Sequence, residues 1–305
     1  MPRLFDKRFV IVAGKGGVGR TTVSLVIGRI AASLGKRALV CLSNAPPRYF
    51  DLIGDVALGS TIRKVSKTLD VVNLEPRACQ EEYGLRILRS RTLHMLIFGS
   101  RLVRGFLDAV PGLAEWAIFG KATFHALRTV DGKPEYDIVV FDSPATGHGL
   151  DVLSLPSAIV SAVPAGRMRE EALARCELME DPDRCEVVPV TVPEEMPVNE
   201  TAEFVAGLHR LGLPVERIVI NMVTQSKVSP VLESMVKTAT DKNDIPSWLL
   251  PAAAVLGRCG AQEESISRLG SILPIGQIKL PLIPGGSLDE ASLLALTAAW
   301  NQRPE

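Results

Sequence analysis

The sequence predicts an α/β fold in which helices flank a mostly parallel β-sheet. Short apolar runs alternate with longer stretches whose apolar residues repeat at helical spacing, as in a parallel sheet covered on both faces. A glycine-rich turn joins the first apolar run, residues 9–12, to the first helical stretch, residues 23–32. The chain has 305 residues and 47% of them are hydrophobic, which is enough for one large core. We therefore expect a single domain over residues 1–305.

The strands are expected where aliphatic and β-branched residues run together between polar or turn-forming residues. These segments are residues 9–12, 38–42, 69–74, 136–141, 186–192, 217–221 and 275–280. Helices should fill the intervals between them. The apolar spacing of residues 288–300 predicts a last helix that closes the chain.

One interval, residues 79–129, is far longer than an ordinary connection between strands. It carries leucines and aromatic residues at helical spacing with arginines between them, which predicts several amphipathic helices. We interpret residues 79–130 as a helical insertion within the domain. Its apolar faces either pack on each other and on the sheet, or form a surface for a protein client or partner.

The glycine-rich turn has the composition of a phosphate-binding loop. Its residues are Gly14, Lys15, Gly16, Gly17, Val18, Gly19, Arg20, Thr21 and Thr22. Glycines let backbone N–H groups turn toward phosphate oxygens, and the following helix offers its N-terminal donors to the same anion. The usual pattern has lysine before the Ser or Thr; here Arg20 stands in that place, and Lys15 follows the first glycine. A turn without a ligand is the alternative, but the order of strand, loop, helix and hydroxyl pair favours a P-loop NTPase.

Phosphoryl transfer also needs a magnesium ion and a positioned water. Thr21 offers a hydroxyl to the ion, and Asp142 ends the apolar strand at residues 136–141. The carboxyl ends of parallel strands meet at one edge of a sheet, where open α/β folds bind their ligands. We therefore expect Thr21 and Asp142 to hold Mg²⁺ beside the loop.

Composition excludes several function classes. Lys and Arg number 34, as do Asp and Glu, so nothing indicates the basic surface of a nucleic-acid-binding protein and no nucleic-acid partner is expected. The five cysteines are odd in number and form no Cys-x-x-Cys pair, which argues against a disulfide framework or a cysteine-rich zinc site. There is no secretory signal and no apolar run of the ~20 residues that span a bilayer, so we expect a soluble cytoplasmic protein.

Several segments resemble one family of P-loop proteins. The Lys-Gly-Gly opening at residues 15–17 resembles the deviant phosphate loop of the SIMIBI-class NTPases. Residues 142–150, Asp-Ser-Pro-Ala-Thr-Gly-His-Gly-Leu, are similar to the second switch of the ArsA family, where Asp-Thr-Ala-Pro-Thr-Gly-His is typical. Further likeness at residues 111–121, 191–201 and 279–282 extends the resemblance over nearly the whole chain. The ArsA family contains the arsenical-pump ATPase and the eukaryotic targeting factor for tail-anchored membrane proteins.

The resemblance implies ATP and Mg²⁺ as ligands and a dimer as the working form. In this class the lysine at the position of Lys15 crosses the dimer interface to the partner's nucleotide. The asparagine at the position of Asn221 reads adenine, and the segment that holds Pro281 and Leu282 packs beside it. His148 lies in the second switch and is either a nucleotide sensor or a structural turn residue. The implied activity is ATP hydrolysis to ADP and phosphate.

Two residues depart from the family's pattern where the chemistry takes place. Arg20 replaces the loop lysine, and a forked guanidinium does not fit a lysine's slot without rearrangement. Asn44 follows the strand at residues 38–42, where relatives carry the aspartate that positions the attacking water. An amide can hold water but cannot act as a carboxylate. The chain is therefore either an enzyme with another water-positioning group or a protomer that binds nucleotide and hydrolyses it slowly.

Three functions remain open. The first is a homodimeric, ATP-gated carrier or chaperone for hydrophobic protein or membrane-protein segments, which the long insertion favours. The second is a degenerate regulatory subunit that forms a heterodimer with an active ArsA-type paralogue, which Arg20 and Asn44 favour. The third is a surface-partitioning ATPase, which lacks the basic patch or terminal amphipathic helix it would need. The absence of clustered thiols argues against arsenite handling.

Overall fold

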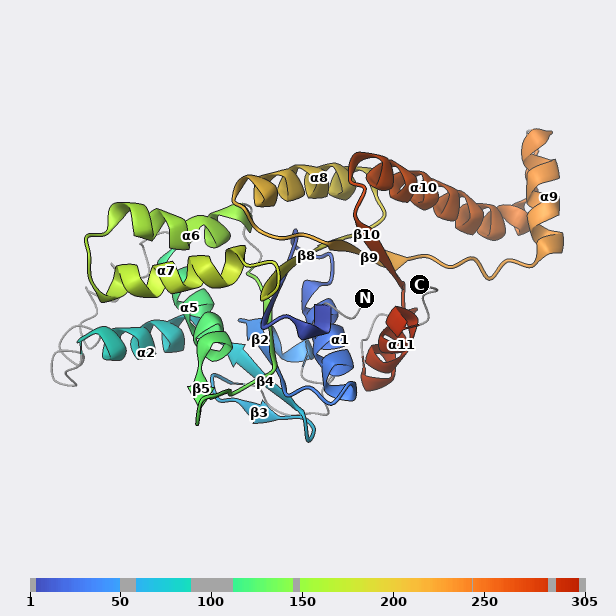
Figure 1. Cartoon of the computed structure of the whole chain (residues 1–305). Helices are drawn as coiled ribbons and strands as arrows, with labels where there is room; N and C mark the ends of the chain where they lie inside the picture. Colours follow the sequence, from blue (N-terminus) through green and yellow to red (C-terminus); the bar gives the residue numbers. More distant parts are fainter. Residues whose placement is uncertain are drawn as a thin grey trace.

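A computed structural model describes residues 4–49, 59–88, 112–144, 149–242, 244–284 and 289–301. Its centre is an eight-stranded sheet in the order β10-β9-β8-β1-β7-β2-β4-β3, parallel except for β3 (Figure 1). The strands are β1 (Phe9–Ala13), β2 (Ala38–Ser43), β3 (Arg63–Lys64), β4 (Leu69–Leu74), β7 (Ile138–Asp142), β8 (Cys185–Thr191), β9 (Arg217–Val223) and β10 (Gly276–Pro281). β5 (Thr129–Val130) and β6 (Lys133–Pro134) form a separate hairpin. The α/β class and the expected parallel sheet are confirmed.

Helices cover both faces of this sheet. They are α1 (Arg20–Ser33), α2 (Pro76–Leu88), α5 (Leu113–Leu127), α6 (Gly149–Ala162), α7 (Arg167–Glu180), α8 (Glu195–Arg210), α9 (Pro230–Asp241), α10 (Leu250–Ile272) and α11 (Glu290–Asn301). Short 3₁₀ turns lie at η1 (Leu4–Asp6), η2 (Pro47–Tyr49) and η4 (Ser247–Leu249). The seven strands that the sequence predicts lie at β1, β2, β4, β7, β8, β9 and β10, with ends shifted by one or two residues.

Each central strand divides its side chains between two apolar cores, because successive residues point to opposite faces. In β1, Phe9 and Ile11 enter one core with α5, α6, α7 and α8. Val10 and Val12 enter the other core with α1 and α11. Burial on both faces explains why the strands read as continuous apolar runs rather than as alternating ones.

The described part of the helical insertion, α2 and α5, packs toward the sheet. Phe119 of α5 meets Phe9 and Phe141 with ring centroids 6.2 and 5.8 Å apart. Trp116 and Ile118 of the same helix are buried. Residues 89–111, the middle of the insertion, lie outside the described residues. The apolar face of α5 therefore belongs to the core of the domain.

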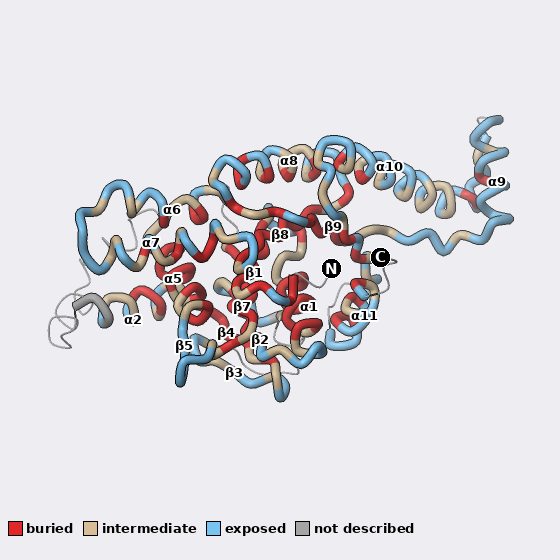
Figure 2. Tube along the Cα trace, in the orientation of Figure 1, coloured by how far each residue is buried: buried red, intermediate tan, exposed pale blue. Residues whose placement is uncertain are grey.

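The helices α9 and α10 extend away from the sheet as an arm (Figure 1). Figure 2 shows α9 and much of α10 as exposed or intermediate, and Val236 is the buried residue of α9. Large exposed apolar side chains lie along the arm: Val231, Leu232, Met235, Trp248 and Leu250. The sequence reasoning expected helices in this interval but not their extension beyond the sheet. Across the described residues, no helix combines the length and the apolar composition needed to cross a bilayer.

Candidate functional site

The glycine-rich loop lies at the carboxyl end of β1, which pairs with β7 on one side and with β8 on the other. A Cβ on Gly14 would lie 2.4 Å from the backbone oxygen of Val190, which cannot move aside, so this position requires glycine. Gly19 has a left-handed backbone with φ 87° and directly precedes α1. The unpaired N–H groups and positive dipole end of α1 therefore adjoin the loop, as a phosphate-binding site requires.

The other loop residues divide between solvent and core. Lys15, Gly16 and Gly17 are exposed, whereas Val18 is buried. Thr22 is also buried, at 3% exposure, so its side chain belongs to the interior rather than to the open face of the loop. Of the two hydroxyls, only that of Thr21 contacts the other predicted metal-site residue.

Thr21 and Asp142 form the pair that the sequence predicts for magnesium. The Thr21 hydroxyl Oγ1 donates to Oδ2 of Asp142 at 2.7 Å. The other carboxylate oxygen, Oδ1, is buried and has no hydrogen-bond partner among the described residues. Burial raises the pKa of Asp142 to about 6, against the opposing effects of the Thr21 hydrogen bond and the Arg20 charge.

A buried, unpartnered carboxylate oxygen beside a hydroxyl suits a hard cation. Mg²⁺ takes oxygen ligands, and it is commonly held by one or two protein groups together with substrate phosphates. The residues present therefore fit this ion, and Thr21 and Asp142 are the side chains that would hold it. In the part of the chain that the structure describes, no group of three or more His, Cys, Asp or Glu residues comes together as a metal site.

Arg20 occupies the lysine position by turning toward the end of β7. Its Nη1 donates to the backbone oxygen of Ser143 at 2.7 Å. Partial burial lowers the pKa of the guanidinium, while the neighbouring Asp142 carboxylate opposes that shift. Arg20 is thus anchored to the residue that directly follows Asp142 and the end of β7.

Asn44 lies at the same edge of the sheet, directly after β2. Its backbone is left-handed with φ 48°, a conformation that asparagine tolerates better than most residues, and it is exposed. The side chain of Asn73 in β4 accepts from the N–H of Ala45 at 2.8 Å and donates to its carbonyl at 3.0 Å. The hydroxyl of Ser43 donates to the backbone oxygen of Asp142. These contacts fix the start of the segment that follows β2.

Sequence reasoning missed the role of Asn73. The residue was placed inside the expected strand at 69–74, and no structural or functional role was predicted for it. The available signal was a polar side chain in an otherwise apolar strand: Asn73 is 4% exposed, and a buried amide needs partners. The residue it holds lies 28 positions away, and spacing along the chain does not reveal that contact.

Asn221 contacts the loop in this structure. Its Nδ2 donates to the backbone oxygen of Val18 at 2.9 Å, and its side chain is buried. The next residue, Met222, has a left-handed backbone with φ 58°. The N–H of Leu282 donates to the oxygen of Val223 at 2.9 Å, which brings the segment after Pro281 to the same corner of the sheet.

A cavity of about 630 Å³ opens at this corner. Met222, Thr224 and Leu282 line it from the sheet, and Gln262 and Arg258 line it from α10. Gln262 accepts from the Thr224 N–H at 2.9 Å and donates to its hydroxyl at 3.2 Å. The structure thus brings Leu282 and the neighbour of Asn221 into one cavity, and adds α10 as a wall that sequence reasoning did not foresee.

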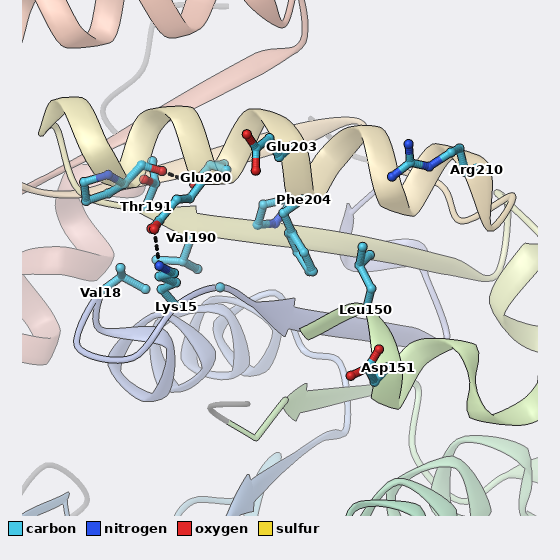
Figure 3. A pocket seen from close by; sticks show the side chains of 14 residues that line it. Lys15, Val18, Leu150, Asp151, Val190, Thr191, Glu200, Glu203, Phe204 and Arg210 are labelled. Carbon is cyan, nitrogen blue, oxygen red and sulfur yellow. Dashed lines mark hydrogen bonds and ion pairs between the residues drawn. The ribbon is translucent and has the colours of Figure 1, made fainter. Parts of the chain in front are cut away.

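A second cavity, of about 440 Å³, adjoins the loop itself (Figure 3). It is bounded by the loop, the end of β8, the start of α6 and one face of α8. Lys15 points across it to Glu200 of α8 and forms an ion pair. Phe204 and Leu150 point toward one another on its opposite side (Figure 3). His148 and the three residues before it lie outside the described residues.

Comparison with known proteins shows which family the chain resembles. A family model described as an anion-transporting ATPase of the ArsA type matches residues 7–165 and 165–243. An arsenical pump-driving ATPase of Acidiphilium multivorum is 27% identical over 232 residues, covering 70% of this chain and 39% of that protein. The ATPase BagA of Mycobacterium tuberculosis is 23% identical over 333 residues, covering 99% of this chain and 94% of BagA.

A eukaryotic relative matches as well. The ATPase ASNA1 homolog of Entamoeba dispar is 26% identical over 263 residues, covering 71% of this chain and 76% of the homolog. The chain spans about two fifths of the arsenical pump ATPase, 39%, but nearly the whole length of BagA. The family model covers well over half of the chain. The resemblance carried by the loop and by the segment after Asp142 is therefore confirmed, and the chain belongs to the ArsA family of ATPases.

Proposed function

We propose that this chain binds Mg²⁺ and ATP at the loop, works as a dimer, hydrolyses ATP slowly and carries hydrophobic protein segments. The observation that carries the nucleotide part is the Thr21–Asp142 pair, with its unpartnered buried carboxylate oxygen beside the loop. The glycine-rich backbone and the start of α1 would receive the phosphates. The magnesium ion, when bound, supplies positive charge to the phosphate oxygens.

The slow hydrolysis follows from what surrounds this pair. Arg20 directs one guanidinium nitrogen to the Ser143 carbonyl, so its charge stands at the end of β7. Asn44, at the neighbouring strand end, can orient a water through its amide but cannot accept a proton as a carboxylate does. Phosphoryl transfer rests on placement and charge, so each substitution is expected to cost rate more than binding.

Exposed apolar side chains among the described residues support the proposal that the chain binds hydrophobic protein segments. α5 is buried against the sheet, so that part of the insertion is not the docking surface. Exposed apolar side chains instead occur on the arm, where Trp248 is 61% and Val231 is 69% exposed.

The alternative is a regulatory subunit that pairs with an active ArsA-type paralogue. Arg20 and Asn44 favour it, because Lys15 is kept while two groups that act on the chain's own nucleotide are changed. The two proposals differ in one outcome. A regulatory subunit stimulates the turnover of an intact paralogue when mixed with it, and the stimulation disappears with Lys15→Ala.

Measuring the affinity for ATP with and without magnesium tests the proposed role of the Thr21–Asp142 pair. ATP binding to the wild-type chain should strengthen when Mg²⁺ replaces EDTA. Asp142→Asn, which keeps the shape and removes the charge, should abolish that gain while leaving magnesium-free binding largely intact. Asp151→Asn, a carboxylate on the wall of the other cavity, is the matched control. An unchanged magnesium gain in Asp142→Asn would show that the site is assigned wrongly.

A further inference from the structure

Lys15 makes its ion pair inside its own chain. Its Nζ contacts Oε1 of Glu200, a residue 185 positions away on α8 (Figure 3). The Lys15 side chain is 57% exposed and that of Glu200 is 28% exposed. The ammonium group therefore lies at the open rim of the cavity, with a carboxylate as its partner.

This position competes with action across a dimer interface. An ammonium group that is paired with Glu200 offers less of its charge to a phosphate bound by another subunit. We propose that Glu200 holds Lys15 in a resting position within its own subunit, and that this contact breaks when Lys15 engages the partner's nucleotide. This inference rests on the dimer of the proposed function. It adds an ion pair within each subunit that opposes formation of that dimer.

Glu200 is presented by a helix that is fixed to the sheet. Val198 and Thr201, its neighbours on α8, are buried, and the Thr201 hydroxyl donates to the Pro197 oxygen at 2.7 Å. Lys15 has a flexible side chain in an exposed loop with glycine on either side. Release therefore needs rotation of the lysine side chain and no movement of α8.

The ion pair between Lys15 and Glu200 is weak enough for a bound nucleotide to break it. Exposed ion pairs are weak, and their loss changes an equilibrium by up to about fivefold. A triphosphate carries several negative charges, so it competes well with one carboxylate for the ammonium group. Removing Glu200 should therefore ease dimer formation modestly and should not make dimerisation independent of nucleotide.

Glu203 provides a matched control. It lies on the same helix, three residues further along, and lines the same cavity. Glu200→Gln and Glu203→Gln remove the same charge from α8 and keep the size of the side chain. Only the first removes the carboxylate that contacts Lys15, so a difference between the two variants reports the ion pair and not the general field of the cavity.

The first measurement needs no dimer. Acylation of Lys15 by an amine-reactive reagent is followed by mass spectrometry in the nucleotide-free chain. Glu200→Gln should raise the labelling rate of Lys15 about two- to fivefold, whereas Glu203→Gln should leave it near the wild-type rate. Equal labelling rates in all three proteins would show that Glu200 does not hold Lys15 and would overturn the inference.

The second measurement is the concentration of a non-hydrolysable ATP analogue at which half of the chain is dimeric. Glu200→Gln should lower it by up to about fivefold, Glu203→Gln should leave it unchanged, and Lys15→Ala should abolish the nucleotide-dependent dimer. A chain that stays monomeric at every analogue concentration contradicts the proposed dimer and the restraint together. A chain that dimerises at the same midpoint with Gln at position 200 contradicts the restraint alone.

Discussion

The Thr21 hydroxyl donates a 2.7 Å hydrogen bond to Oδ2 of Asp142, while Oδ1 of the same carboxylate is buried without a partner in the described structure. The two residues come from different elements, the start of α1 and the end of β7, and meet because β7 pairs with β1. A buried carboxylate oxygen left unpaired is costly, and a cation bound at this edge, as proposed, would give Oδ1 a partner.

Thr21→Val keeps the shape of the side chain and removes the hydroxyl. The magnesium-dependent part of ATP affinity should fall about tenfold or more, because even outer partners of a metal site are worth about 10–100-fold. Isothermal titration with Mg²⁺ present, and again with EDTA, measures that part directly. Thr22→Val, the adjacent buried threonine, should leave it unchanged. Equal losses in the two variants would mean a general disturbance of α1.

Gly19→Val should abolish nucleotide binding while the fold survives. A Cβ on Gly19 would lie 2.2 Å from Nδ2 of Asn221, and the backbone there has φ 87°. The substitution therefore displaces Asn221 from its bond to Val18 and strains the loop. The overpacking alone, about 1–3 kcal/mol, corresponds to a loss of affinity of about five- to 150-fold.

Gly16→Ala is the matched change within the same loop. Apart from its two chain neighbours, no atom of the described residues lies within 4 Å of the position its Cβ would take, so the methyl group meets no obstacle among them. Nucleotide affinity should stay within about threefold of wild type, and circular dichroism should report the native fold for both variants. If the folded Gly19→Val protein still binds ATP, the glycine-rich loop is not the nucleotide-binding site.

Arg217→Met should destabilise the chain strongly without altering the site. Arg217 Nε donates to Oε1 of the fully buried Glu186 at 2.6 Å, at the amino ends of β9 and β8. Removing one partner of a buried pair leaves an uncompensated charge and costs about 3–5 kcal/mol of unfolding free energy. Urea denaturation measures the loss. Adding Glu186→Gln to Arg217→Met should restore most of it; a double variant as unstable as the single one would argue against the charge as the cause.

The chain should lose stability below about pH 6.5 through His125. This side chain is 3% exposed, and burial lowers its pKa, an effect that Lys121 reinforces and Glu135 opposes. The unfolded chain then takes up a proton at a higher pH than the folded chain, so stability falls as the pH drops, by at most about 1.4 kcal/mol per pH unit. Thermal unfolding between pH 5 and 8 tests this. His125→Phe should flatten the curve, and parallel curves for the two proteins would exclude His125 as its source.

The parts of the fold and site that the sequence could predict are those that depend on neighbours along the chain. The loop needs its glycines in order, and Asp142 ends a strand whose apolar run is unmistakable. Thr21 and Asp142, 121 positions apart, could be brought together because parallel strand ends meet at one edge. Other contacts between distant segments were not predictable: Asn73 with Ala45, Gln262 with Thr224, and Glu200 with Lys15 join residues 28, 38 and 185 positions apart. Spacing along the chain carries no signal for such pairs.

Short or isolated elements escaped prediction for another physical reason. β3, β5 and β6 have two residues each, too few to show any period. The apolar residues of α5 and α9 read alike as helix faces, yet Phe119 is buried on the sheet and Val231 is exposed on the arm. Periodicity shows that a helix has an apolar face, but it does not show what covers that face.

The fate of ATP on the isolated chain tests the central claim most directly. The measurement mixes the chain with labelled ATP and Mg²⁺ and follows bound nucleotide and released phosphate together, in wild type and in a variant that combines Arg20→Lys with Asn44→Asp. The account predicts that both proteins bind about one ATP per chain and that the variant releases phosphate at least about tenfold faster, because each restored group improves placement or charge at the site. Absence of bound ATP in the wild-type chain, or equal phosphate release by the two proteins, would contradict it.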